Sequence, residues 1–506
     1  MLHKGLVRCD TRPQSGLGHL KRCLVIASKL SDIGIESIFL VDRVIESPPS
    51  GRFNFLITGG RVGSNSLIDA QEVCRVATEN NCDFVFGDSY EITPEWIERV
   101  RAQGFFVGVF DDLNTLANAD CRINFSPQAC PLGVVGLELT GPAFFPYQGP
   151  GRIAKGPRPR SVIFHAGGTG DFSLRELVYR TLSSRARRSS LSITWLIANQ
   201  SSQQFLIDSG LFSDGDLERE WSNAHPMVWQ EFDLVVGPAS TSLYEAIIQG
   251  ALPLSFVISD SQSDSREQWL AIGHSLHLTS ADCMDAKAIE HFFDLGLQQF
   301  SVLLSHLHRL SYSLDGKGGE RISAALRSNA SPLEPLAPKA TMRTGEVRAC
   351  DFPDALRFLQ ARNAQGVRSV STDTREIPWV HHINWWLNTE IERFVFVRQD
   401  LEEGYFWHRA CVVSQRKYLI GGWFPATASP SFDVAIRMLD WQLTYCSQHH
   451  PDHVWVATIQ RSNQAVIALN RRFGFTEASA ECMRDIDSLF PGTTSDYVVL
   501  ERASKL

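Results

Sequence analysis

The chain has 506 residues, of which 43% are hydrophobic and 21% are charged, and at about 100 to 200 residues per domain this length suggests roughly three domains. The formal net charge of −8 argues against an extended basic surface that binds the phosphates of a nucleic acid. The 11 cysteines lack paired spacing, so neither a disulfide scaffold nor a structural zinc site is expected. No window approaches about 18 uninterrupted apolar residues, so a membrane-spanning helix is not expected. We therefore predict a cytoplasmic protein with no required metal and with neither nucleic acid nor membrane as a partner.

The first segment, residues 1–150, alternates β-rich apolar runs with stretches of helical length. This alternation is typical of βα units on a parallel sheet, and it predicts a Rossmann-like domain of the α/β class. In the helix expected after the first strand, Leu20 and Leu24 recur at helical spacing and predict the buried face, whereas Lys21 and Arg22 fall toward the other face. The strand candidates are GLVRCD, IESIFLV, NFLIT, DFVFGD, FFVGVFDD and CRINFS.

A Gly- and Pro-rich basic stretch from Tyr147 to Arg160 predicts a linker. Residues 160–327 then restart the alternation, which predicts a second, nucleotide-binding Rossmann-like domain. Helices are expected near Ser173, Thr241 and Gln262. The strand candidates are SVIFHAGG, LSITWLIA, FDLVVGPAS and ALPLSFVIS.

A polar, Pro-rich tract from about Ser328 to Gly345 separates this pair from residues 345–506. That last segment begins with two helices and continues with three strands in succession, a helix, a strand and a final helix. Because its strands and helices do not alternate regularly, we predict an α+β domain. The strand candidates are RFVFVRQ, HRACVVS, KYLIGGW and HVWVATI.

A small-residue turn, Ser15-Gly16-Leu17-Gly18-His19, follows the first strand and opens a helix. Free N–H groups and the helix dipole attract anions at such a place, and Gly16 and Gly18 let a ligand approach the backbone. The dipole also disfavours the charged form of His19 and so favours a neutral base. The turn is neither a Walker sequence nor a GxGxxG fingerprint, and a histidine that only caps or packs locally is the alternative.

Two further turns of small residues follow strands of the second domain. One spans residues 165–170 and includes Gly168, and the other spans residues 237–242 and leads into a helix that carries Glu245. Ligands of open α/β sheets bind outside the carboxyl ends of the strands, so we expect these turns to face a cleft and to receive a nucleoside diphosphate. The alternative is that they are ordinary tight βα turns.

These motifs together resemble the UDP-2,4-diacetamido-2,4,6-trideoxy-β-L-altropyranose hydrolases of pseudaminic acid synthesis, over roughly residues 5–325. The matching residues are Arg8-Cys9-Asp10, Gly16-Leu17-Gly18-His19, Arg22-Cys23, Asp88-Ser89-Tyr90, Asp111-Asp112-Leu113, Gly167-Gly168 with Asp171, Ser240-Thr241-Ser242 with Glu245, Gln262, Gly273, and Asp315-Gly316 with Arg321.

The resemblance implies two Rossmann-like domains in a glycosyltransferase-B-like arrangement, in which water replaces the sugar acceptor. It implies His19 as the base, with Asp10 and Tyr90 nearby. The remaining substrate contacts would fall on Gly16, Gly18, Gly168, Ser240, Thr241, Ser242, Glu245, Ser261 and Gln262. Ser261 stands where the family usually has Asn, and its shorter side chain implies a change in how the sugar is recognised. We expect direct displacement at the sugar C1 with inversion and without a metal.

The segment from Asn463 to Phe475 resembles the C-terminal motif of GNAT acyltransferases, and residues 362–385 resemble the branch that acetylates the 4-amino group of a UDP-sugar. This resemblance implies acetyl-CoA as the cofactor and His382 as a sugar contact. Asn470 stands where the family commonly has a tyrosine general acid. The stretch expected to hold the pyrophosphate, residues 425–432, has no Gly and no Arg. A catalytically silent binding module, with His382 packed on the sheet, is the alternative.

The whole chain is therefore predicted to hydrolyse a UDP-sugar and to carry a GNAT-like domain that acetylates the precursor of that sugar. Two alternatives stay open. One is an inverting glycosyltransferase that passes the sugar to an acceptor. The other is a non-catalytic nucleotide-sugar binding protein in which the GNAT-like part is a scaffold.

Overall fold

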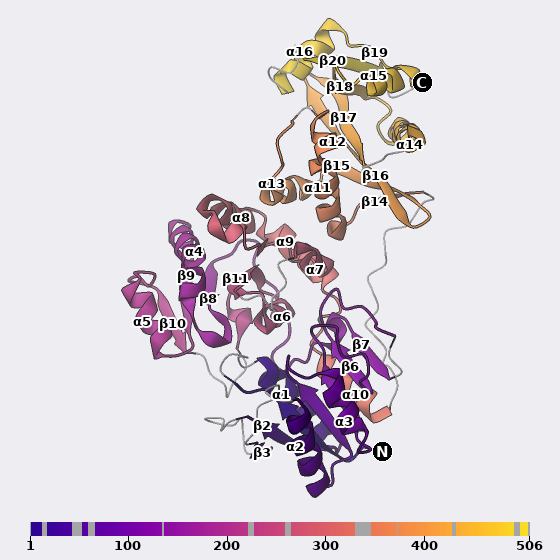
Figure 1. The fold of residues 1–506 in the computed structure, drawn as a ribbon. Helices are drawn as coiled ribbons and strands as arrows, with labels where there is room; N and C mark the ends of the chain where they lie inside the picture. The colour runs from indigo at the N-terminus through magenta and orange to yellow at the C-terminus, as the bar shows by residue number, and fades with distance from the viewer. Residues whose placement is uncertain are drawn as a thin grey trace. The chain divides into compact units, whose positions relative to one another are not determined.

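In the computed structural model the chain forms two compact units, Met1–Pro338 and Lys339–Leu506 (Figure 1). The first unit contains two parallel sheets, and the second contains one mixed sheet. The described residues are 2–12, 18–42, 53–58, 66–133, 136–220, 227–258, 265–328, 346–371, 373–427, 432–489 and 496–503.

The first sheet has seven strands in the order β3-β2-β1-β4-β5-β6-β7, and every neighbouring pair is parallel. The predicted parallel α/β arrangement is confirmed here. The strands are β1 (Lys4–Cys9), β2 (Glu36–Val41), β3 (Asn54–Ile57), β4 (Phe84–Asp88), β5 (Phe106–Phe110), β6 (Cys121–Asn124) and β7 (Leu137–Thr140), and the helices are α1 (Gly18–Asp32), α2 (Ser66–Glu79) and α3 (Pro94–Arg101).

The strand order reverses between β1 and β4, because the chain runs outward from β1 to β3 and then returns to the other side of β1. In open α/β sheets such a switch point leaves a crevice at the carboxyl ends of the two strands. β1 ends at Cys9 and β4 ends at Asp88. Helix α1, which carries His19 in its first turn, therefore follows one of the two strands at the switch point.

The second sheet has six strands in the order β10-β9-β8-β11-β12-β13, and its neighbouring strands are parallel. Its order reverses between β8 and β11, and both predicted small-residue turns follow these two strands. The strands are β8 (Ser161–His165), β9 (Ser192–Ile197), β10 (Leu217–Glu220), β11 (Leu234–Pro238), β12 (Leu252–Phe256) and β13 (His277–Leu278), and the helices are α4 (Glu176–Arg188), α5 (Gln200–Asp208), α6 (Thr241–Gln249), α7 (Arg266–Ala271), α8 (Ala286–Gln298), α9 (Phe300–Leu310) and α10 (Gly318–Ser328).

Helix α10 follows the second sheet in the chain but packs against the elements of the first. Lys29 Nζ on α1 lies 2.6 Å from Glu320 Oε1. A Cβ on Gly318 would lie 2.1 Å from the carbonyl oxygen of Phe145, so only glycine permits this close approach. The two parallel sheets are thus connected by a returning helix inside one unit.

The second unit contains a seven-stranded sheet in the order β14-β15-β16-β17-β18-β20-β19. Only β17 and β18 pair in parallel within the part that the structure describes, and the other neighbours are antiparallel, which confirms the α+β prediction. The strands are β14 (Val347–Ala349), β15 (Ile391–Arg398), β16 (Leu401–Val413), β17 (Arg416–Pro425), β18 (Val454–Gln460), β19 (Thr476–Glu477) and β20 (Tyr497–Ala503), and the helices are α11 (Ala355–Asn363), α12 (Gln365–Arg368), α13 (Trp379–Trp386), α14 (Phe432–His449), α15 (Gln464–Arg472) and α16 (Ala480–Leu489).

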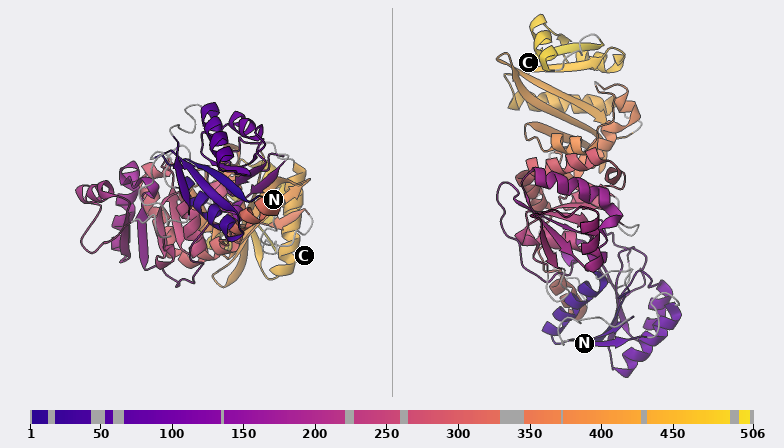
Figure 2. Two further views of the ribbon diagram at one scale, coloured as in Figure 1. Left: turned by 90° about the horizontal axis from the view of Figure 1, so that it is seen from below. Right: turned by 90° about the vertical axis from the view of Figure 1, so that its left-hand side faces the viewer.

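The indigo and purple strands of the first sheet lie side by side in the left-hand view of Figure 2. Leu419, Leu439 and Trp455 belong to a buried core between the mixed sheet and α14. Among the described residues, no helix is long and apolar enough to cross a membrane.

Candidate functional site

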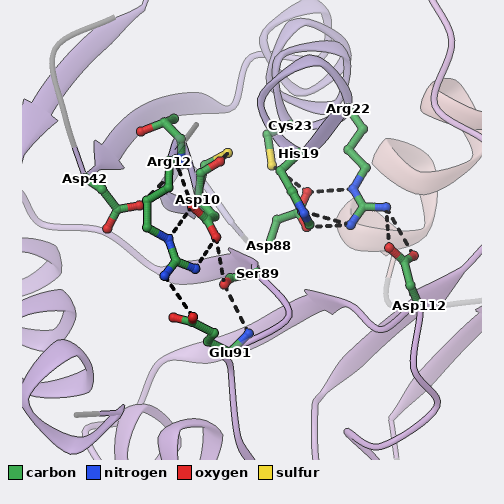
Figure 3. A network of polar contacts seen from close by, with 12 residues as sticks. Asp10, Arg12, His19, Arg22, Cys23, Asp42, Asp88, Ser89, Glu91 and Asp112 are labelled. Atoms are coloured by element: carbon green, nitrogen blue, oxygen red, sulfur yellow. Dashed lines mark hydrogen bonds and ion pairs between the residues drawn. The ribbon is translucent and has the colours of Figure 1, made fainter. Parts of the chain in front are cut away.

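His19 is held by Asp88 across the switch point of the first sheet (Figure 3). His19 Nδ1 lies 2.6 Å from Asp88 Oδ1, and the histidine is 3% exposed. Burial opposes ionisation of Asp88, but the charge of Arg22 and the contact with His19 outweigh it and hold the pKa of this carboxyl well below its ordinary value. An ionised carboxylate only accepts hydrogen bonds, so Nδ1 carries the proton and donates it to Asp88. In a neutral imidazole with its proton on Nδ1, Nε2 is the nitrogen that can accept a proton.

Arg22 fixes the carboxylate that orients His19. Its Nε and Nη2 donate to the two oxygens of Asp88 at 2.7 and 2.6 Å, and its Nη1 donates to Asp112 at 2.8 Å. The guanidinium also lies 4.2 Å from the ring centroid of Phe110. Because Nδ1 of His19 already donates to Asp88, the 3.2 Å approach of Arg22 Nη2 to that nitrogen is a contact between two donors. Arg22 therefore acts on His19 through Asp88.

The expectation that Arg22 lies on the face of its helix turned away from the core is wrong. Arg22 is 6% exposed, because the buried carboxylate of Asp88 supplies the charge that a buried guanidinium needs. Neither half of the pair is recognisable from helical spacing, since the two residues are 66 positions apart in the chain.

Asp10, which the family resemblance places beside the base, makes its described contacts in a neighbouring network (Figure 3). Its carboxylate accepts hydrogen bonds from Arg12 Nε at 3.0 Å and Nη2 at 2.6 Å, and from the hydroxyl of Ser89 at 3.4 Å. The backbone N–H of Asp10 donates to the carbonyl of Asp88 at 3.0 Å. Asp10 thus adjoins the residue that orients His19, and its charge is compensated by Arg12.

Tyr90 is the expected partner that does pack directly on the base. Its ring meets the His19 ring edge-on, with the centroids 4.8 Å apart, and Tyr90 is 45% exposed. Burial, followed by the charge of Asp112, raises the pKa of Tyr90 to about 12. The phenol is therefore neutral at physiological pH and remains a hydrogen-bond donor.

The turn after β8 is shaped by a buried neutral histidine. Burial lowers the pKa of His165 to about 3, and its Nδ1 accepts a hydrogen bond from the N–H of Gly167 at 3.2 Å. A Cβ on Gly237 would lie 2.0 Å from Nε2 of this ring. Gly168, a predicted substrate contact, lies exposed in the same turn.

The turn after β11 presents the N-terminus of α6. Ser240 is the N-cap residue, yet its side chain makes no capping hydrogen bond and instead contacts the hydroxyl of Ser242 at 2.8 Å. As the first N–H groups of a helix, those of Thr241 and Ser242 have no intrahelical acceptor. Glu245, one turn further on, accepts a hydrogen bond from the indole of Trp229 at 3.0 Å.

The starts of α1 and α6 approach each other within the first unit. A Cβ on Gly18 would lie 3.9 Å from both Cγ2 and Oγ1 of Thr241. The switch points of the two sheets therefore contribute to one region, where two helix N-termini favour an anion. Three predicted contacts, Gly16, Ser261 and Gln262, lie outside the described residues.

The second unit holds a cavity of about 1060 Å³ at its two parallel strands. β17 and β18 pair only from Tyr418 to Ile420 in the described register. Beyond Ile420 and Val456 the register between these two strands ends, although each still pairs with its other neighbour, and residues of both line the cavity. The backbone of β17 on this side is thus turned toward a cavity.

Two of the three predicted residues of this unit line the cavity. They are Asn463, whose side chain caps α15 by accepting from Val466 N, and Asn470, which donates to the carbonyl of Val466 at 2.8 Å. His382 is 3% exposed, its Nε2 lies 2.9 Å from the carbonyl oxygen of Ala355, and burial lowers its pKa to about 3. Its position matches the packed-helix alternative.

The chain matches no family model and no curated protein sequence. Its fold is similar to several solved structures. Spinosyn rhamnosyltransferase SpnG is 14% identical over 64% of this chain and 99% of its own, with a TM-score of 0.45. MnaA of S. aureus in complex with UDP is 10% identical over 65% and 99%, with a TM-score of 0.49. MurG of Acinetobacter baumannii is 15% identical over 65% and 100%, with a TM-score of 0.44.

Proposed function

We propose that the first unit hydrolyses a UDP-2,4-diacetamido-2,4,6-trideoxyhexose of the altropyranose type to UDP and the free sugar. The observation that carries this proposal is the pairing of His19 with Asp88 next to the uncapped start of α6. One side of the region offers a neutral base, and the other offers N–H donors for a diphosphate. The sequence motifs supply the sugar class.

In the proposed reaction His19 removes a proton from water through Nε2. Among the described residues this nitrogen has no hydrogen-bond partner, while Nδ1 stays bound to Asp88. The water oxygen forms a bond to C1 of the sugar, and the bond from C1 to the phosphate oxygen breaks with its electron pair leaving on UDP. The attack inverts the configuration at C1. General base catalysis of this kind contributes about 10²- to 10⁴-fold.

The departing UDP gains negative charge that fixed donors can stabilise. The N–H groups of Thr241 and Ser242 point out of the start of α6, and the hydroxyls of Ser240 and Ser242 stand beside them. Glu245 keeps one carboxylate oxygen beyond the one bound to Trp229, and this oxygen suits a ribose hydroxyl. The reaction needs no metal in this arrangement.

Burial of His19 at 3% exposure sets a condition on this mechanism. Water must reach Nε2, and the half-exposed Tyr90 is the described ring that covers His19. We infer that Tyr90 changes position when substrate binds and that its neutral hydroxyl then donates to the substrate.

The experiment compares wild-type protein with His19→Asn, measuring both UDP affinity by calorimetry and UDP release from the UDP-sugar without any acceptor. We expect release to fall about 10²- to 10⁴-fold while UDP affinity stays unchanged. Unimpaired release by His19→Asn refutes His19 as the base. Release that depends on an added acceptor supports the glycosyltransferase alternative, and tight UDP-sugar binding without turnover supports the binding protein.

For the second unit we propose N-acetylation of a UDP-4-amino-sugar. Acetyl-CoA, when bound, would supply the acetyl group. Support comes from the fit of the cavity: the register between β17 and β18 ends at Ile420 and Val456, and the residues beyond it line the cavity, where backbone groups without a strand partner suit the amide groups of a pantetheine chain. Arg362 also lines the cavity, and its Nη1 is buried without a hydrogen-bond partner among the described residues, which suits a phosphate group.

A further inference from the structure

Three metal-binding side chains meet on the mixed sheet of the second unit. They are Glu392 on β15, His408 on β16 and His450 directly after α14, and one ligand atom of each lies within 4.8 Å of the other two. We propose that Glu392, His408 and His450 bind one Zn²⁺ or a similar transition-metal ion. Their chemistry supports this choice, because two imidazoles and one carboxylate suit zinc, whereas calcium and magnesium prefer all-oxygen sites.

The present distances are close to those of a coordinated set. His408 Nε2 lies 2.8 Å from Glu392 Oε2, and His450 Nε2 lies 3.2 Å from the same oxygen. Ligands at about 2.0 to 2.2 Å from a tetrahedral zinc ion are about 3.3 to 3.6 Å apart. An ion therefore fits after His408 and Glu392 separate by about 0.5 to 0.8 Å, which a rotation of the half-exposed glutamate side chain supplies.

The backbone holds the three ligands in place from three separate elements. Glu392 and His408 are directly opposite each other in the antiparallel pairing of β15 and β16. His450 is fixed at the end of α14 by a hydrogen bond from its N–H to the carbonyl of Cys446 at 2.8 Å. Because the ligands are 16 and 58 residues from Glu392 in the chain, no short spacing motif reveals the cluster.

Surrounding groups orient the ligands, as they do in protein metal sites. The hydroxyl of Tyr445 donates to the second carboxylate oxygen of Glu392 at 3.0 Å. The His408 ring stacks on Phe394 with centroids 5.5 Å apart and meets Trp455 edge-on at 5.9 Å. These aromatic walls exclude water from the buried side of the site.

The opposite side is open to solvent. The His408 side chain is fully buried, but those of Glu392 and His450 are 36% and 23% exposed. An ion can enter from that side and retain a water molecule as its fourth ligand, which is the coordination of zinc sites with three protein ligands. Without an ion, Glu392 accepts hydrogen bonds from both imidazoles, and the experiment distinguishes this state from a metal site.

The test uses the untagged full-length chain, treated with EDTA, dialysed free of the chelator and titrated with Zn²⁺ by calorimetry. We expect one strong site per chain with a Kd of about 1 μM or tighter and a rise in Tm on adding Zn²⁺. Titration with Co²⁺ should give the visible absorption of a four-coordinate ion. No binding at this level, or a Co²⁺ spectrum of a six-coordinate ion, overturns the proposal.

Variants assign the site to these residues. His450→Ala and Glu392→Gln should each weaken Zn²⁺ binding at least about 10-fold, and both positions are exposed enough for the fold to tolerate the change. His381→Ala, which removes an exposed histidine of α13, is the matched control and should bind as wild type does. Zn²⁺ affinity that is equal in wild type, His450→Ala and Glu392→Gln contradicts the assignment, even if the protein binds zinc elsewhere.

Discussion

If the first unit hydrolyses a UDP-sugar as proposed, asparagine in place of Asp88 should abolish most of this activity by reversing the tautomer of His19. Asp88 accepts from His19 at 2.6 Å and from Arg22 at 2.7 and 2.6 Å. Asparagine keeps one acceptor oxygen, and the permanently charged Arg22 donates to it. The NH₂ group of the asparagine then faces His19. Nδ1 must then accept, so the proton moves to Nε2 and the base is lost. The wrong tautomer costs about 10⁴-fold in catalytic triads, equivalent to about 5.4 kcal/mol of activation free energy.

The assay measures UDP release, UDP affinity and Tm for Asp88→Asn beside a matched control, Asp69→Asn. Asp69 is also a buried carboxylate bound to a buried arginine, Arg8 at 2.8 Å, but no histidine contacts it among the described residues. Loss of one partner of a buried pair costs about 3–5 kcal/mol of stability, so both variants should have a lower Tm. Only Asp88→Asn should lose turnover of the protein that remains folded. Equal turnover in the two variants would refute the tautomer argument.

Three further predictions concern other parts of the chain. Gly237→Ala places a Cβ 2.0 Å from His165 Nε2 and should lower stability by about 1–3 kcal/mol in urea unfolding, whereas Gly151→Ala, with open space around it, should change little. The pKa of His165 is lowered to about 3, so its neutral form stabilises the fold above its unfolded pKa of about 6.5, and this contribution declines as pH falls from there toward 3. In His165→Gln the free energy of unfolding should therefore fall less steeply as pH decreases over this range, by up to about 1.4 kcal/mol per pH unit. The same pH dependence in the variant and the wild type would contradict the buried neutral state. Ala457→Trp places a large side chain in the cavity of the second unit. It should abolish the proposed acetyl-CoA binding in calorimetry and leave the proposed UDP-sugar hydrolysis unchanged. A heat of acetyl-CoA binding equal to that of the wild-type protein would exclude the cavity as the binding site.

Sequence patterns predicted the architecture because local signals determine it. Alternating apolar runs and helical stretches indicated both parallel sheets, and small residues marked the turns after β1, β8 and β11. Helix α1 and the turns after β8 and β11 follow strands at the switch points of the two sheets, and open α/β sheets bind ligands at such points.

The side-chain partners were not predictable in the same way. The link from His19 to Asp88 spans 69 residues, and the family resemblance instead implied Asp10 and Tyr90 near the base. The spacing of apolar residues predicted that Arg22 lies on the exposed face of its helix. That spacing does not reveal a buried carboxylate that comes from another strand. The signal that was present is the strand end itself: Asp88 is the last residue of β4, and Asp10 directly follows β1, its neighbour at the switch point.

The most direct measurement of the central claim is hydrolysis of the UDP-sugar in ¹⁸O-labelled water, with mass spectrometry of both products and NMR of the anomer formed first. Attack of His19-activated water at C1 predicts that ¹⁸O enters the sugar, that UDP carries none, and that the first free sugar has the inverted configuration. Label in UDP would mean cleavage at phosphorus, and it would contradict the account.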